Sequence, residues 1–162
     1  MSESALFKTA LNKAMALCSR REYCIRDIQD KLESWGLGYS DNMKIIDLLK
    51  KENFINEERF ATAFVKDKFN YNKWGKIKIS SHLRAKQIQG NIIKTALDSI
   101  DQEVYTKVIN DLIISHRRSV KAKNQYDLKA KLLRYGLSKG FESSIVYDVL
   151  NSQMKDTYVD PE

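Results

Sequence analysis

An internal repeat with a period of about 50 residues limits this chain to a small number of folds. In two segments the apolar residues are spaced four and then five positions apart: Ile28, Leu32 and Leu37 in IRDIQDKLESWGL, and Ile79, Leu83 and Ile88 in IKISSHLRAKQI. A further amphipathic segment precedes each copy, and another follows it. Each copy therefore indicates a unit built as helix, connection, helix, tight turn, helix.

A third copy lies in KAKLLRYGLSKGF, where two alignments are open. One uses Leu133, Leu137 and Phe141, spaced four and four. The other uses Leu128, Leu132 and Leu137, which keeps the four-five spacing. Either alignment gives a third repeat of the same kind.

Proline and glycine, the main helix breakers, are scarce, with one proline near the C-terminus and six glycines. We therefore predict an all-α fold of three tandem three-helix repeats, each resembling a helix-turn-helix. Because small repeats pack mainly on their neighbours, we expect an elongated, curved array. The predicted bounds are 1–53, 54–101 and 102–151, followed by an acidic C-terminal tail at 152–162.

Local signals support these helices. Asn56 can cap the helix that begins EERF, and Ser40 or Asp41 can cap the helix that follows the first tight turn. Glycines fall where the chain must turn, at Gly36, Gly75 and Gly140.

Charge is distributed unevenly along the chain, whose formal net charge is +7 and whose pI is about 9.3. Residues 66–94 hold eight basic residues against one acid, and so do residues 116–139. This pattern predicts a polyanionic partner, either nucleic acid or an acidic protein groove. No apolar run approaches the roughly 20 residues that a membrane span needs, and the N-terminus lacks the order of a signal peptide, so we expect a cytoplasmic protein.

Basic residues recur at one position of the repeat, the connection between the first and second helices, and continue along the second helices. We predict a partner-binding or nucleic-acid-binding surface, here called the basic set: Arg20, Arg21, Arg26, Lys73, Lys76, Lys78, Arg84, Lys86, Arg117, Arg118, Lys121, Lys123, Lys131 and Arg134. The alternative is a series of ordinary solvated helix faces. Trp74 and Tyr71 could stack on a base or cover a helix end, and we favour the structural role.

Nothing in the sequence indicates catalysis. It has no phosphate-binding glycine loop, nucleophile elbow or zinc-ligand spacing. The acid pairs Asp27–Asp30 and Glu57–Glu58 fit solvated helix faces better than a general acid and base. We interpret Cys18 and Cys24 as small residues on the core side rather than redox thiols. We expect no enzyme activity, cofactor or metal.

Three stretches resemble the RecX family of recombination regulators. They are ALCSRREYCIRDIQDKLESWGL in the first repeat, FINEERFATAFVKDKFNYNKWGKIKISSHLRAKQI in the second, and KLLRYGLSKGFESSIVYDVL in the third. The second stretch is the most specific: an acidic turn precedes an RFA helix, followed by a glycine, a basic segment and a leucine-rich helix. The sequence departs from the family pattern at Cys24, where a small polar residue is common, and at Lys86-Gln87-Ile88, which lacks the usual glycine.

This resemblance implies three helix-turn-helix-like repeats and a non-enzymatic role. Family members are understood to bind the RecA–single-stranded DNA filament and to restrain its growth, ATP hydrolysis and strand exchange, in recombination, DNA repair and the SOS response. Some also bind DNA directly. We expect this chain to be a monomer that binds the RecA filament in the same way as these family members. The alternatives are a protein that binds DNA through its own repeats and, third, a hydrolase, which would need a pocket with converging acids.

Overall fold

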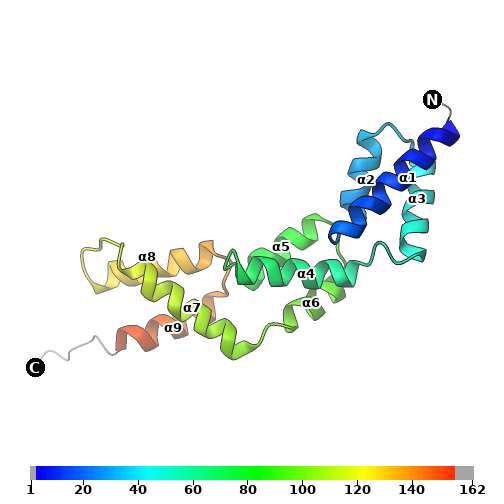
Figure 1. Ribbon diagram of the computed structural model, residues 1–162. Helices are drawn as coiled ribbons and strands as arrows, with labels where there is room; N and C mark the ends of the chain where they lie inside the picture. The colour runs from blue at the N-terminus through cyan, green and yellow to red at the C-terminus, as the bar shows by residue number, and fades with distance from the viewer. Residues whose placement is uncertain (1–2, 156–162) are drawn as a thin grey trace, which may run out of the picture. The chain divides into compact units, whose positions relative to one another are not determined.

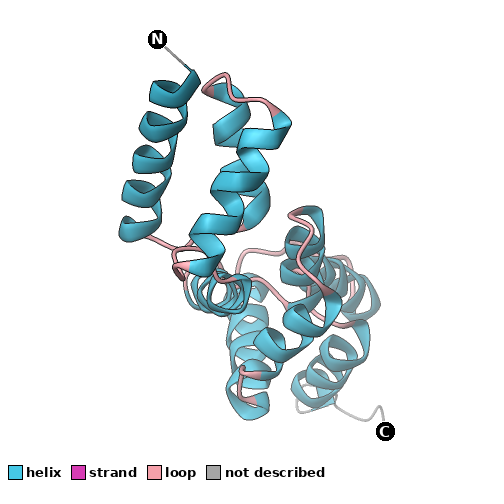
Figure 2. Ribbon diagram, turned by 90° about the vertical axis from the view of Figure 1, so that its right-hand side faces the viewer, coloured by secondary structure: helices cyan, strands magenta, loops and turns pink. Residues whose placement is uncertain are grey.

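The computed structural model describes residues 3–155, which form nine α-helices and no strand (Figure 1, Figure 2). The helices are α1 (Glu3–Arg20), α2 (Ile25–Ser34), α3 (Tyr39–Lys51), α4 (Glu57–Asn70), α5 (Lys76–Ala85), α6 (Gly90–Asp98), α7 (Gln102–Arg117), α8 (Gln125–Ser138) and α9 (Ser143–Lys155). The predicted all-α fold of three-helix repeats is confirmed. The bounds of the repeats stay predictions, and residues 156–162 of the predicted tail lie outside the described residues.

The helices group into two compact units. The first unit comprises residues up to 65 together with 83–96, and the second comprises residues 66–82 together with those from 97 onward. Helices α4, α5 and α6 therefore contribute residues to both. Among residues 3–155, no helix is both long enough and apolar enough to cross a membrane.

The core of the first unit comes from the apolar stripes of α1, α2 and α3. Ala10 and Ala14 of α1 are buried against residues of α2 and α3 that are almost fully excluded from solvent: Ile28, Leu32, Ile45, Ile46 and Leu49. Local helical periodicity thus places each stripe, and packing joins them.

Tyr105 of α7 is the centre of the second unit, and its side chain is fully buried. Its ring contacts Phe69 at 5.7 Å and Phe141 at 5.6 Å between centroids. Its hydroxyl donates to the Glu142 carboxylate and accepts a 2.9 Å hydrogen bond from the Lys76 amide. This one residue therefore holds the start of α5 and the start of α9 against α7.

The same tight turn ends the second helix of each repeat. A residue in the left-handed region follows the helix, with φ of 88° at Gly36, 63° at Gln87 and 91° at Gly140. The next amide then donates a 3.2 Å hydrogen bond to the carbonyl five residues back, in the pairs Leu37–Leu32, Ile88–Leu83 and Phe141–Gly136. This is the Schellman motif. The family's usual glycine is therefore replaced by Gln87 without loss of the turn.

Both alignments considered for the third repeat are wrong at Leu137, which is 42% exposed. The buried positions are Leu132, Gly136 and Phe141, which restore the four-five spacing. Gly136 is buried because the Val146 methyl carbons lie 2.8 and 3.0 Å from where its Cβ would be. A valine of α9 thus fills the place that a leucine of the second helix fills in the other repeats.

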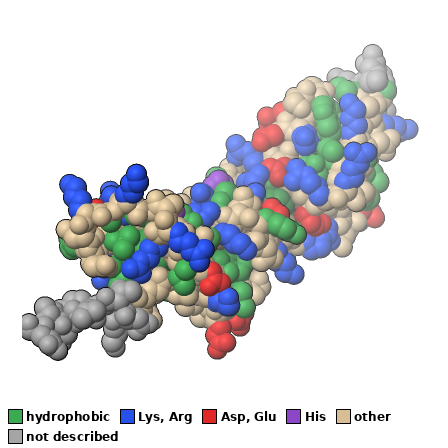
Figure 3. Space-filling model, turned by 60° about the vertical axis from the view of Figure 1, so that its left-hand side comes forward, with side chains coloured by type: hydrophobic (Ala, Val, Ile, Leu, Met, Phe, Trp, Pro, Cys, Tyr) green, Lys and Arg blue, Asp and Glu red, His purple; other side chains and the backbone are tan. Residues whose placement is uncertain are grey.

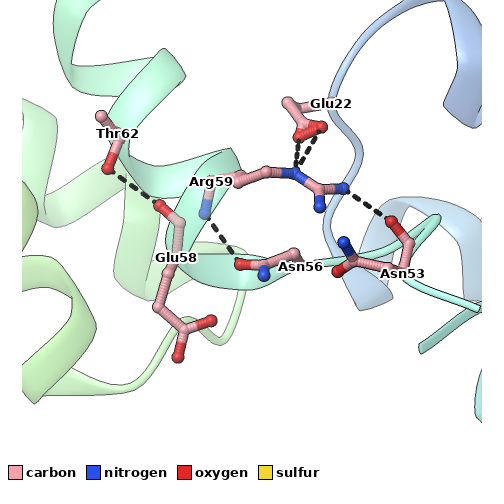
Figure 4. Close-up of polar contacts among 6 residues, drawn as sticks. All are labelled: Glu22, Asn53, Asn56, Glu58, Arg59 and Thr62. Atoms are coloured by element: carbon pink, nitrogen blue, oxygen red, sulfur yellow. Dashed lines mark hydrogen bonds and ion pairs between the residues drawn. The ribbon is translucent and has the colours of Figure 1, made fainter. Parts of the chain in front are cut away.

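Of the two helix caps predicted from the sequence, the structure confirms one and contradicts the other. The Asn56 side chain accepts a 3.0 Å hydrogen bond from the Arg59 amide, so the predicted cap of α4 is confirmed (Figure 4). The cap predicted at Ser40 or Asp41 is wrong, because α3 begins at Tyr39 and Gly38 is its N-cap, with no side-chain hydrogen bond.

Candidate functional site

The basic set divides between the two units, and each part is described within its own unit. The first unit holds Arg20, Arg21, Arg26, Arg84 and Lys86, and the second holds the other members. On the face drawn in Figure 3, acidic and hydrophobic side chains lie among the lysines and arginines. The value of each basic residue for binding therefore depends on its local partners.

Arg20 and Arg21 mark the connection from α1 to α2, and both side chains are exposed. The Arg21 guanidinium lies 4.0 Å from the ring centroid of Tyr23, a cation–π contact that orients it. The neighbouring acid, Glu22, pairs with Arg59 rather than with these two arginines. These two arginines are therefore available to an anionic partner.

Glu22 is held by Arg59, a residue outside the predicted basic set (Figure 4). The Arg59 Nε lies 2.9 and 3.1 Å from the two Glu22 carboxylate oxygens, and its Nη2 donates a 2.9 Å hydrogen bond to the Asn53 carbonyl. The hydrogen bond to Glu22 raises the pKa of Arg59. Arg59 thereby ties the loop after α1 to the start of α4, and its charge is committed to structure.

Lys86 of the first unit is likewise held in an ion pair. Its Nζ lies 2.8 Å from the Asp27 carboxylate, and both side chains are at most one-third exposed. Arg26 pairs with Asp30 at 3.5 Å on the exposed face of α2, whereas Arg84 is exposed on α5. Arg84 is therefore better placed than Lys86 to meet a partner.

Three of the four acids weighed for catalysis form ion pairs or hydrogen bonds within the first unit. Asp27 and Asp30 form the ion pairs just described, and Glu57 accepts a 3.2 Å hydrogen bond from the Ile25 amide at the start of α2. Burial raises the pKa of Glu57. Asp27 and Glu57 thus link α2 to other segments of the first unit, whereas Asp30 pairs within α2 itself.

The cysteines lie on the core side, as interpreted from the sequence. Cys24 is fully buried, and its Sγ accepts a hydrogen bond of 3.4 Å from the Asp27 amide, so it caps α2 in place of a small polar residue. Burial raises the pKa of Cys24 to about 11 and also raises that of Cys18. Neither thiol is activated as a nucleophile.

Trp74, in the loop between α4 and α5, is half-buried within a set of cations. Its ring lies 4.5 Å from the ring of His82, and the ammonium groups of Lys78 and Lys68 lie 4.7 and 5.2 Å from its centroid. Its amide also donates to the Lys68 carbonyl at 3.1 Å. These contacts favour the structural role for Trp74. Tyr71 differs, because 83% of its surface is exposed.

The start of α5 is seated on the turn between α8 and α9. The Gly75 amide donates to the Lys139 carbonyl at 2.7 Å, and the Ile77 amide donates to the Gly140 carbonyl at 3.0 Å. This seat positions Lys76, whose ammonium lies 4.9 Å from the ring centroid of Tyr105. Lys76 and Lys78 are thus half-buried, and their charged ends lean on aromatic rings.

The connection from α7 to α8 carries the most exposed cluster of the basic set, at Arg118, Lys121 and Lys123. Asp127 shapes this loop: it accepts a 3.0 Å hydrogen bond from the Lys123 amide and lies 3.3 Å from the Lys131 ammonium. Both contacts lower the pKa of Asp127. Lys131 also donates to the Lys121 carbonyl at 2.6 Å, so Lys131 braces the loop.

Two aromatic residues accompany this loop. The ring of His116 stacks on that of Tyr135, with centroids 3.7 Å apart and planes at 9°, which joins the end of α7 to α8. Tyr126, in the first turn of α8, is 85% exposed. Among residues 3–155, no ion pair engages the side chains of Arg117, Arg118, Lys121 or Lys123. This loop is therefore the strongest candidate binding surface within the second unit.

Metal binding finds no support in the described part of the chain. Across residues 3–155, no three side chains of His, Cys, Asp or Glu come together in a way that could hold a metal ion.

Comparison with known proteins places these features in one family. Residues 56–97 match the second three-helix domain of RecX. A regulatory protein RecX from Clostridium beijerinckii is 30% identical over 156 residues, which cover 95% of this chain and 72% of the relative.

Two crystal structures share the fold. One, of a regulatory protein RecX, has a TM-score of 0.81 at 22% identity, over 93% of this chain and 72% of that one. The other, of RecX from Lactobacillus salivarius, has a TM-score of 0.80 at 22% identity, over 96% of this chain and 99% of that one.

Proposed function

Because this chain belongs to the RecX family of regulatory proteins, we propose that it binds the RecA–single-stranded DNA filament and restrains its growth, ATP hydrolysis and strand exchange. The observation that carries the proposal is family membership over nearly the whole chain. The protein acts in the cytoplasm as a monomer, by binding and without catalysis of its own.

The basic set supports this proposal in a narrower form than the sequence suggests. Lys86 and Lys131 serve the fold through ion pairs and hydrogen bonds. Exposed charge remains for a partner at Arg20, Arg21 and Arg84 in the first unit, and at Arg118, Lys121 and Lys123 in the second. Exposed cations attract a charged partner over roughly a Debye length, about 8 Å at physiological salt.

ATP hydrolysis by RecA on single-stranded DNA tests this function. We expect the purified protein, added in stoichiometric amounts to preformed filaments, to lower the hydrolysis rate. A boiled sample and an unrelated basic protein of similar charge serve as controls for inhibition by charge alone. An unchanged rate at stoichiometric protein would contradict the proposal.

A second candidate is direct binding of DNA, favoured by the cations of the α7–α8 loop beside the exposed Tyr126. It predicts binding to DNA without RecA, with an affinity that falls steeply as salt rises, by a slope of about 0.9 per phosphate neutralised on duplex DNA. Fluorescence anisotropy with labelled DNA at several salt concentrations measures this slope. Absent or salt-independent binding would rule the second candidate out.

A further inference from the structure

A groove in the first unit lies outside every residue assigned above. It is formed by Phe7 of α1 and by Lys44, Asp47, Leu48 and Lys51 of α3, and its volume is about 370 Å³. That volume falls within the roughly 300–1,000 Å³ of ligand clefts, although this groove is open to solvent. It is therefore large enough to receive side chains of another molecule.

The floor of the groove is apolar. Leu48 is 40% exposed, and Phe7 is only partly buried where it packs against the core. Lys44, Leu48 and Lys51 are spaced four and then three apart, which puts them on one face of α3. A lone exposed leucine is ordinary on a protein surface. Here a leucine and a phenylalanine from two helices instead share one concave site.

The rim of the groove is positive at both ends. Lys44 and Lys51 are exposed, and Asp47 is the acid between them. Among the described residues, none of these three forms an ion pair, so both ammonium groups are available. A partner that buried its apolar side chains here would gain more if it also carried carboxylates near its ends.

We propose that this groove docks an acidic amphipathic segment of a partner protein. Apolar side chains of the segment pack on Phe7 and Leu48, and its Asp or Glu side chains pair with Lys44 and Lys51. Asp47 repels a carboxylate at the centre, which selects apolar groups there. Such a helix-in-groove mode combines apolar anchors with a charged rim.

The groove is distinct from the basic set. Phe7 and Arg20 lie near opposite ends of α1, which at 1.5 Å per residue separates them by roughly 20 Å. The apolar floor also provides no hydrogen-bond donor and no positive charge for a phosphate backbone. The proposal therefore stands independently of filament or DNA binding by the arginines.

Fluorescence anisotropy with two helical peptides tests the proposal on the full chain. One probe carries leucine on one face and glutamate on the other, and its counterpart carries lysine in place of glutamate. We expect only the acidic probe to bind. The K44E/K51E variant should weaken this binding roughly tenfold or more, because two attractions become repulsions. K13E/K66E makes the same change in net charge at exposed lysines outside both the groove and the basic set, and should leave binding unchanged.

A second variant separates packing from charge. L48N keeps a side chain of similar size at an exposed position, so circular dichroism should show an intact fold while binding of the acidic probe falls. Equal binding of both probes, or no binding of either, would overturn the proposal, as would equal losses in K44E/K51E and K13E/K66E. If analytical ultracentrifugation showed dimers of the unmodified chain that L48N dissociates, the groove would bind a second copy of the chain instead. If K44E/K51E lost DNA binding, the groove would bind nucleic acid.

Discussion

Gly75 lies so close to Gly140 that a Cβ on Gly75 would overlap the Gly140 carbonyl group. The contact is backbone against backbone, and it is reinforced by the hydrogen bonds from Gly75 to Lys139 and from Ile77 to Gly140. The loop that carries Lys73, together with the start of α5 at Lys76, is thereby fixed against the turn after α8. A glycine expected to serve a turn thus also serves a close approach.

Replacing Gly75 with alanine should destabilise the protein by about 1–3 kcal/mol, the usual cost of overpacking, because the obstructing atoms are backbone. Chemical denaturation followed by circular dichroism measures the change. G90A is the matched control, since no atom lies within 4 Å of where its Cβ would be. Equal effects of G75A and G90A would contradict the close-approach argument.

Replacing Gln87 with glycine should stabilise the protein by about 0.5–1 kcal/mol. Gln87 has a φ of 63°, and a left-handed conformation costs a residue with a Cβ roughly 1–2 kcal/mol, of which glycine's chain entropy offsets a part. Thermal unfolding should show a higher Tm for Q87G. Q87A keeps the Cβ and should show no such gain; a gain of the same size there would rule out backbone strain as the cause.

Tyr105 should make stability fall in alkali. Burial, and then the hydrogen bond to Glu142, raise its pKa above the ordinary value of 10.0, so the unfolded chain releases this proton first. The contribution of Tyr105 to the free energy of unfolding is therefore complete below about pH 10 and declines as pH rises further. Denaturation at pH 8 to 11 measures the slope.

The Y105F variant isolates this titration. It should cost about 1–3 kcal/mol near neutral pH, because the Lys76 amide loses its acceptor and Glu142 loses its donor. Its stability should also depend less on pH above 10 than that of the unmodified chain. An identical alkaline slope in both proteins would show that another group titrates.

Lys86 should matter for stability more than for binding. K86A leaves the Asp27 carboxylate, whose side chain is 20% exposed, without its ion pair, and should cost about 1 kcal/mol. R26A breaks a pair whose side chains are 45% and 63% exposed, and should cost under about 0.5 kcal/mol. Urea denaturation compares them. If K86A abolished filament binding without any loss of stability, Lys86 would instead be a residue that contacts the filament.

Alanine at Arg117, Arg118, Lys121 and Lys123 should weaken association while leaving helical content intact, because these side chains form no ion pair within residues 3–155. Inhibition of RecA ATP hydrolysis then requires more protein, and any slope of DNA affinity with salt falls by about 0.9 for each phosphate that is no longer neutralised. K8A/K107A removes exposed charge outside the basic set and should behave as the unmodified chain. Undiminished inhibition by the fourfold variant would exclude this loop.

Much of the fold could be predicted from the sequence because its signals are local. Apolar spacing along one helix face predicted the buried Ile28, Leu32, Ile79 and Leu83, since a stripe needs only the helical period to form. The Asn56 cap followed from three neighbouring residues in the same way. The connections that carry the basic residues were likewise predicted as boundaries between helices.

The candidate site was less predictable because its charges depend on distant partners. The contact between Arg59 and Glu22 spans 37 residues, and that between Lys86 and Asp27 spans 59. No sequence spacing distinguishes such paired cations from exposed ones. Only the arrangement of helices reveals that Arg59 and Lys86 stabilise the fold whereas Arg118 and Lys121 remain exposed.

The helices, their repeat and the sign of the net charge follow from the amino-acid sequence alone, because helical periodicity is local, recurrence of a pattern can be read along the chain, and charge is a sum over residues. Which side chains at those positions are buried or paired follows from the tertiary structure. Gly136 rather than Leu137 faces the core because Val146 occupies the space, and Gly75 is needed because Gly140 approaches it. Close packing makes each such choice depend on the volume of a neighbour from elsewhere in the chain.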